Sequence, residues 1–192
     1  MGPQDSETSN ALLDATERVI RSRGYAAATS RSIAEEAGLK QQIVYYYFRS
    51  MDDLLVATFR RRAMRARTRL GTVLASDRPL RALWENYSNA VDARLNFEFM
   101  ALANHNEVFR EEINRYVTEM RQIETAAVER IYLRKNIENH PVSPSALIFL
   151  MNCTALTMGH EQATGIEIAH DEISELVNRA LEFFDPIPDD EK

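Results

Sequence analysis

The residues best suited to chemistry in this chain form one short run in which cationic, amide and phenolic side chains follow one another. Lys40 can bind a phosphate oxygen, and the amides of Gln41 and Gln42 can each form two hydrogen bonds with adenine. Ile43 offers an apolar contact for the methyl group of thymine. Hydroxyls of the kind that commonly bond phosphate oxygens follow at Tyr45, Tyr46 and Tyr47. This set of side chains indicates the reading of a DNA duplex.

Two short helices are expected to position these side chains, within the segment 29–48, TSRSIAEEAGLKQQIVYYYF. Gly38 can adopt the positive φ that a tight turn requires. Ala34, Gly38 and Val44, spaced four and six apart, form the skeleton of a helix-turn-helix, whose second helix would enter the major groove. Three consecutive tyrosines span most of a helix circumference, so at least one must face the core. The alternative is a plain helix pair with aromatic packing.

The rest of the chain also shows helical spacing, and no strand or hairpin signal stands out. We therefore predict an all-α protein: a three-helix helix-turn-helix domain followed by a helical bundle. The N-terminal domain is predicted over 1–55, with a fourth helix to about 74 as connector, and the second domain over 75–192. Helices are predicted over about 8–23, 29–37, 41–47 and 50–74, and apolar stripes of helical spacing follow at 80–91, 95–102, 109–131, 145–163 and 173–184.

Composition and charge narrow the class of protein. The chain has 192 residues, 45% apolar and 27% charged, which is typical of a folded soluble protein. A single cysteine argues against a disulfide framework, and the polar N-terminus lacks the pattern of a secretory signal. We expect a cytoplasmic protein with no membrane span. The net charge of −6 hides a split, because residues 1–70 carry +4 and residues 71–192 carry −10, an asymmetry that can orient a protein on a polyanion.

The segment 145–163 is apolar on nearly every face. Such a helix must be buried all round. In a chain of this size we expect one face to pack on the body of the protein and the other on a second subunit, together with the stripe at 173–184.

Residues 24–55, GYAAATSRSIAEEAGLKQQIVYYYFRSMDDLL, closely resemble the N-terminal domain of TetR-family transcriptional regulators. The resemblance is strong over about residues 8–70. The positions that match the family pattern are Gly24, Tyr25, Thr29, Ile33, Ala34, Ala37, Gly38, Tyr45, Phe48 and Leu54.

The resemblance implies roles for individual residues. Ser30 and Arg31 should contact the DNA backbone or a base, residues 40–43 should face bases, and the three tyrosines should clamp phosphates. Three positions depart from the family pattern: Tyr47 stands where His is common, Gln42 where Gly or Pro is common, and Met51 where Lys is usual. The loss of that lysine puts affinity in doubt.

The resemblance also implies a homodimer with a C-terminal domain that binds a small effector. A twofold dimer would require a palindromic operator, and repression relieved by the effector is the expected regulation. Large apolar side chains with a few polar ones favour an apolar or aromatic effector, although ordinary core packing is the simpler explanation for each residue. The candidates are Trp84, Tyr87, Phe97, Met100, His105, Tyr116, Met120, Phe149 and Asn152.

Other classes of function find less support. Glu167 and His170 form half of a di-iron motif, but the second half is missing and a loop is expected there. Cys153 and His160 share one helix face, for which burial is the simpler explanation. We therefore expect no enzyme activity, metal or cofactor. The main alternative is a dimeric small-molecule-binding protein that has lost DNA recognition. The six arginines between residues 60 and 69 fit either phosphate contact or a solvated helix face.

Overall fold

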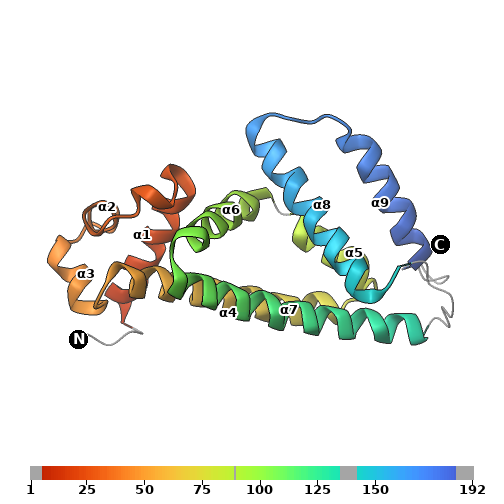
Figure 1. Ribbon diagram of the computed structural model, residues 1–192, viewed down its shortest axis with the longest axis horizontal. Helices are drawn as coiled ribbons and strands as arrows, with labels where there is room; N and C mark the ends of the chain where they lie inside the picture. The colour runs from red at the N-terminus through yellow and green to blue at the C-terminus, as the bar shows by residue number, and fades with distance from the viewer. Residues whose placement is uncertain (1–5, 89, 135–141, 185–192) are drawn as a thin grey trace. The chain divides into compact units, whose positions relative to one another are not determined.

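A computed structural model describes residues 6–88, 90–134 and 142–184. Those residues form helices and no strand, which confirms the predicted all-α class (Figure 1). The elements are α1 Glu7–Arg23, the 3-10 turn η1 Tyr25–Ala27, α2 Ser30–Glu36, α3 Gln41–Tyr47, α4 Met51–Leu74, α5 Pro79–Tyr87, α6 Ala90–His105, α7 Glu107–Arg134, α8 Pro144–Thr164 and α9 His170–Phe184.

The chain divides into two compact units. The first contains the described residues up to Ala66 together with Arg94–Tyr116, and the second contains Arg67–Ala93 and the described residues from Val117 onward. The helices α4, α6 and α7 therefore each contribute residues to both units. The division into a DNA-binding domain and an effector domain stays a prediction.

Capping residues set the ends of the first helices. The hydroxyl of Ser6 accepts a hydrogen bond from the backbone N–H of Ser9 and begins α1. Gly24 ends α1 at a φ of +83°, a conformation that favours glycine. Thr29 and Ser32 form a capping box that begins α2, in which each side chain satisfies the other's backbone N–H. These local interactions explain why the predicted bounds of the first four helices lie close to the observed ones.

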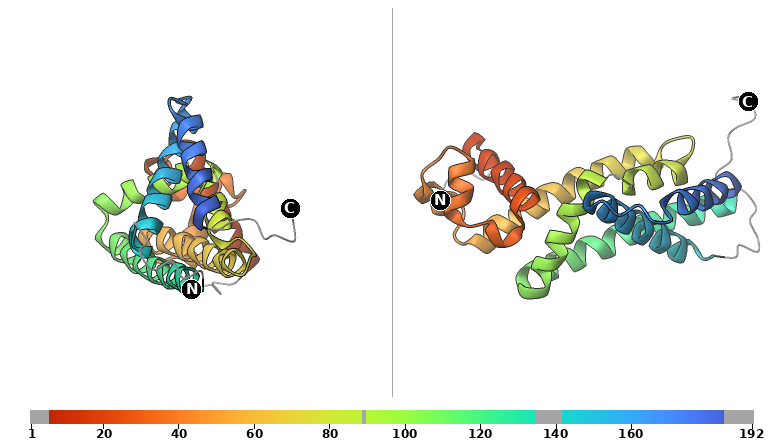
Figure 2. Two further views of the ribbon diagram at one scale, coloured as in Figure 1. Left: turned by 90° about the vertical axis from the view of Figure 1, so that its right-hand side faces the viewer. Right: turned by 90° about the horizontal axis from the view of Figure 1, so that it is seen from above.

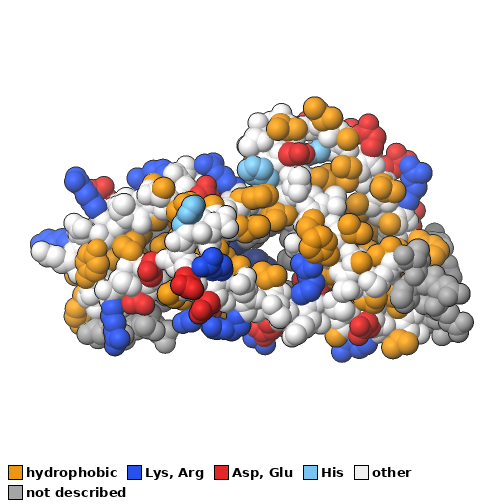
Figure 3. All heavy atoms as spheres, viewed as in Figure 1, with side chains coloured by type: hydrophobic (Ala, Val, Ile, Leu, Met, Phe, Trp, Pro, Cys, Tyr) orange, Lys and Arg blue, Asp and Glu red, His pale blue; other side chains and the backbone are white. Residues whose placement is uncertain are grey.

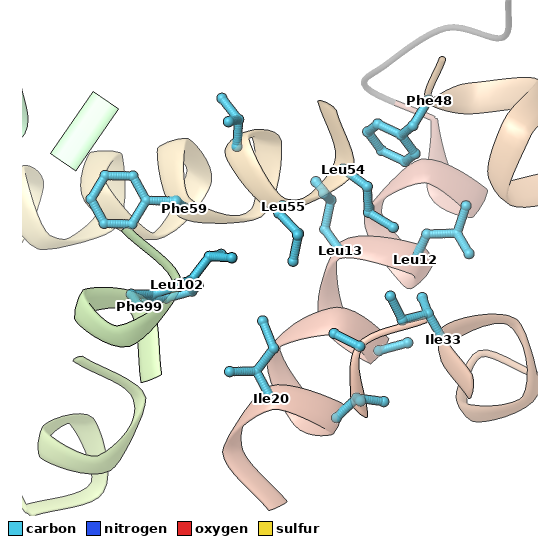
Figure 4. Packing of buried hydrophobic residues seen from close by; sticks show 14 of the residues in the cluster. Leu12, Leu13, Ile20, Ile33, Phe48, Leu54, Leu55, Phe59, Phe99 and Leu102 are labelled. Carbon is cyan, nitrogen blue, oxygen red and sulfur yellow. The ribbon is translucent and has the colours of Figure 1, made fainter. Parts of the chain in front are cut away.

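A hydrophobic core holds the first unit together (Figure 4). Phe59 of α4 packs edge-on against Phe99, Phe109 and Tyr116, with ring centroids 5.3–5.5 Å apart. The residues labelled in the figure come from α1, α2, α4 and α6 and from the end of α3: Leu12, Leu13, Ile20, Ile33, Phe48, Leu54, Leu55, Phe59, Phe99 and Leu102. This core attaches the α2–α3 pair firmly to α1 and α4.

In the second unit, α5 contacts both α8 and α9, which run in opposite directions (Figures 1 and 2). One side of α8 is buried through Ile148, Met151, Ala155 and Gly159. The other side is exposed within this single chain, and its residues Phe149 and Leu150 are each about half exposed. In the described parts of the chain, none of the helices combines the length and apolarity that a membrane span needs. The sequence also predicts a polar, proline-containing loop over 136–144, and most of this segment lies outside the described residues.

Candidate nucleic-acid interface

The turn between α2 and α3 has the geometry of a helix-turn-helix. Gly38 adopts a φ of +68°, in the left-handed region. The N–H of Leu39 donates to the carbonyl of Ala34 at 2.8 Å, and the N–H of Gly38 donates to the carbonyl of Glu35 at 3.1 Å. Because Val44 is fully buried, α3 is held with one face against the core and the opposite face outward.

The outward face of α3 carries most of the predicted reading residues. Lys40 precedes the helix and is exposed, as are Gln41 and Gln42 on its first turn. The side chains of Tyr45 and Tyr46 are 52% and 55% exposed. Cationic, amide and phenolic groups therefore share one accessible surface.

Two of the predicted reading residues lie partly against the core. Ile43 and Tyr47 are half-buried and pack on the hydrophobic cluster of the first unit. The ring of Tyr47 meets that of Tyr46 edge-on, with centroids 5.1 Å apart. One of the three tyrosines therefore faces inward, as the sequence predicts.

Ser30 lies inside the helix pair. Ser30 is only 7% exposed. The Nε2 of Gln41 donates to the Oγ of Ser30 at 2.8 Å, and the hydroxyl of Tyr45 donates to the same oxygen at 3.3 Å. Ser30 therefore connects α2 to two outward residues of α3, a role that the sequence analysis did not foresee because it considered Ser30 only as a DNA contact.

Arg31, beside it, is exposed and forms an ion pair with Glu35 at 2.9 Å. Hydrogen bonding to the Glu35 carboxylate raises the pKa of Arg31 above its usual value. This pair lies one helical turn apart on the solvent side, so a phosphate would compete with Glu35 for the guanidinium.

Five of the six arginines of α4 bind carboxylates or amides of the protein itself. Arg61 pairs with Asp14 at 2.6 Å and with Glu17 at 3.2 Å, and Arg62 donates to Asn96 at 3.0 Å. Further pairs join Arg60 to Glu112, Arg65 to Glu17 and Arg67 to Glu119. These contacts favour a structural role for this part of α4 over direct phosphate binding.

The departure at Met51 has a packing explanation. Met51 begins α4, is half-buried and packs on the core of the first unit. Arg49, two residues earlier, is exposed between α3 and α4. Sequence analysis missed this residue, although a basic side chain just after the reading helix is a signal for phosphate contact.

The candidate effector residues fall into both units. Phe97, Met100, His105 and Tyr116 belong to the first unit, and Tyr116 is part of its aromatic packing. The remaining five, Trp84, Tyr87, Met120, Phe149 and Asn152, belong to the second unit. Their role in binding an effector stays a prediction.

A cavity of about 450 Å³ lies elsewhere in the second unit, between the ends of α4, α5 and α7. Its lining consists of residues that the sequence analysis did not select: Leu74, Pro79, Ala127, Arg130, Ile131 and Leu133.

The second unit also buries a carboxylate. Glu124 of α7 is 6% exposed, and burial raises the pKa of its carboxyl. The neighbouring hydroxyl of Tyr87 and the positive charge of Arg121 act in the opposite direction. Arg121 also lies over the ring of Phe149, 5.2 Å from its centroid. Tyr87 and Phe149, two of the candidate effector-binding residues, thus lie beside the side chains of Glu124 and Arg121.

The residues of the two pairs considered for metals lie in different surroundings. Glu167 lies in the loop before α9, and the imidazole Nε2 of His170 lies 2.9 Å from the Oε2 of Glu161 instead. Among the described residues, no group of three or more His, Cys, Asp or Glu side chains is arranged to hold a metal ion. Cys153 is exposed, so the expectation that it is buried is wrong for the single chain, because α8 turns that side away from α5.

Comparison with known proteins agrees with this geometry. The sequence model of "Bacterial regulatory proteins, tetR family" matches residues 12–58. The transcriptional regulator BetI of Rhizobium meliloti is 44% identical over 50 residues, which are 26% of this chain and 25% of that protein. The chain therefore matches only a quarter of the length of this curated relative.

Solved structures share the fold over nearly the whole chain. A TetR transcription regulator from Haloarcula marismortui superposes with a TM-score of 0.70 at 19% identity, covering 93% of this chain and 96% of that one. A protein from Saccharomonospora viridis, solved in complex with choline, gives a TM-score of 0.76 at 20% identity, covering 90% and 94%. The sequence match to the tetR family of bacterial regulatory proteins therefore covers residues 12–58, and the likeness over nearly the whole chain is one of fold.

Proposed function

We propose that this chain is a DNA-binding transcriptional regulator, most simply a repressor, that leaves its operator when a small molecule binds its C-terminal part. The observation that carries the proposal is the outward face of α3, where Lys40, the two glutamines and two exposed tyrosines lie together on a helix-turn-helix. This combination supplies phosphate contacts and base-edge contacts at the same surface.

The proposed interface divides these tasks between residues. Gln41 and Gln42 reach base edges from the first turn of α3, and Lys40 binds a phosphate beside them. Tyr46 binds a phosphate from the same face, and Tyr45 does the same when its single O–H turns from the Oγ of Ser30 to a phosphate oxygen. Arg31 and Arg49 flank the helix and add positive charge, while Ser30 acts from inside the helix pair. Tyr47 and Ile43 contribute mainly through packing, because both are half-buried.

We propose that the active species is a homodimer formed through α8 and α9. Both helices expose large apolar side chains, including Phe149, Leu150, Leu176 and Phe183, and Figure 3 shows hydrophobic side chains spread over this region. Exposed apolar surface on this scale marks an interaction site. A twofold dimer places two reading helices about 34–36 Å apart, or a multiple of that distance, so the operator would be palindromic. Such a protein would act in the bacterial cytoplasm, on the nucleoid when bound to DNA.

The effector is proposed to be a small, largely apolar or aromatic molecule bound within the second unit. The large side chains Trp84, Tyr87, Met120 and Phe149 of that unit support this choice. The choline complex of the related fold makes an organic cation the natural comparison compound. Because α4 is one continuous helix with residues in both units, it is the proposed route by which the effector alters the spacing of the readers.

The test is selection of genomic DNA fragments on the purified protein, followed by sequencing and by affinity measurement over a range of salt concentrations. We expect one enriched palindrome and an affinity that falls steeply as salt rises. Q42A, which removes an exposed amide of α3, should weaken the enriched site. Q122A, which removes an exposed amide of α7, is the matched control and should leave it unchanged. Absence of any enriched sequence would contradict the proposal and favour a protein without DNA recognition.

A further inference from the structure

We infer that Ser30, although it does not face the DNA, sets the base preference of the reading helix by holding the amide of Gln41 in one orientation. This inference rests on the proposed function. It assigns Ser30 the part of a positioning residue, which acts through Gln41.

The first step is the hydrogen bond itself. The Nε2 of Gln41 lies 2.8 Å from the Oγ of Ser30, although the two residues are eleven positions apart and belong to different helices. Ser30 is 7% exposed and sits on the first turn of α2, whose position is fixed by the capping box of Thr29 and Ser32. The hydroxyl of Tyr45 donates to the same oxygen at 3.3 Å. The acceptor for Gln41 is therefore a rigid, buried point.

The hydrogen bond to Ser30 limits the donors and acceptors that the Gln41 amide can offer to a base. A glutamine amide has two N–H donors and one carbonyl acceptor. Ser30 takes one N–H, so one donor and the carbonyl oxygen remain for a base. Adenine presents N6–H as donor and N7 as acceptor in the major groove, which matches that remaining pair, whereas guanine presents two acceptors, O6 and N7. The pinned amide therefore favours adenine over guanine.

The third step is the effect of releasing the amide. The terminal torsion of glutamine is broad and roughly two-fold. Without the serine oxygen, the Gln41 amide of S30A can turn and offer both donors toward the groove, so adenine loses its advantage. Alanine suits a helix, and Thr29 rather than Ser30 provides the cap, so α2 should remain formed.

The experiment uses the full-length chain and a randomised DNA library, with base preferences read at every operator position. The proteins are the wild type, S30A, Q41A, the double variant S30A/Q41A and S30T, which keeps the hydroxyl. S32A is the matched control, since Ser32 lies on the same short helix but bonds to Thr29 and Ala27. A bidentate contact of this kind discriminates by roughly five- to 150-fold, which sets the size of the preference to be lost.

We expect S30A and Q41A to flatten the preference for adenine at the same operator position. The double variant should be no flatter than Q41A, and S30T should retain the preference. S32A should lower the melting temperature and leave every preference unchanged. The inference is overturned if S30A weakens binding equally at all positions, or if its effect persists in the Q41A background. A wild-type protein that enriches no sequence would instead overturn the proposed function.

Discussion

Replacing Gly38 by alanine isolates the backbone requirement of the turn between α2 and α3. Gly38 has a φ of +68°, and a methyl group there would meet no atom within 4 Å, so the cost of G38A is conformational alone. The left-handed region costs a residue with a side chain about 1–2 kcal/mol. Alanine also lowers the entropy of the unfolded chain, which offsets about 0.4–1 kcal/mol. We expect a net loss of about 1 kcal/mol, which lowers Tm by about 2–4 °C in a protein of this size.

Two further variants separate backbone strain from crowding. G38N should melt above G38A, because asparagine tolerates the left-handed region. G24A should melt lowest, because Gly24 has φ +83° and ψ 162°, a region essentially confined to glycine, and a methyl group would lie 3.3 Å from the Oε2 of Glu98. Thermal unfolding followed by circular dichroism, at one fixed protein concentration, measures all three. The reasoning is refuted if G38A melts at or above the wild type, or if G38N melts below G38A.

Four further variants test single side chains elsewhere in the chain. Burial raises the pKa of Glu124, so the native state binds the carboxyl proton more tightly than the unfolded chain does. The contribution of Glu124 to the free energy of unfolding therefore falls as pH rises above 4.5. Melting curves should therefore show that the Tm of E124Q relative to the wild type is higher at pH 8 than at pH 5. An equal Tm difference at the two pH values would contradict this. The pKa of Glu112 shifts in the opposite direction, because a hydrogen bond from Arg60 lowers it. The contribution of Glu112 to the free energy of unfolding is therefore present above pH 4.5 and is lost as pH falls through the native pKa. Urea titrations of E112Q should show a deficit at pH 6 that shrinks toward pH 3. K40A should weaken DNA binding about equally across sequences and reduce the slope of log affinity against log salt by about one, whereas a change confined to one base pair would indicate base reading instead. L176E should sediment as a monomer if α9 forms the dimer interface, while M64E, at an equally exposed methionine of α4, should leave the wild-type assembly state unchanged.

The second helix of the helix-turn-helix could be predicted because its signals are local in the sequence. Helix α3 begins and ends at the predicted residues, Gln41 and Tyr47, and the turn glycine has the positive φ that its position requires. The inward tyrosine also follows from local geometry, since three consecutive residues span most of a helix. Caps, turn residues and apolar spacing act within a few positions, so they can be read without the fold.

Other features depend on residues far apart in the sequence, and only the tertiary structure decided them. The N–H of Tyr25 donates to Glu98, 73 positions away, at 2.8 Å. Arg61 binds carboxylates of α1 rather than facing a phosphate. The same reason applies to Ser30: the family resemblance implied a DNA contact, but the crossing of α2 and α3 buries it against Gln41. The sequence by itself therefore determined the helices and the surface proposed to read DNA, whereas the packing of one helix on another decided which side chains face that surface and which hold it in place.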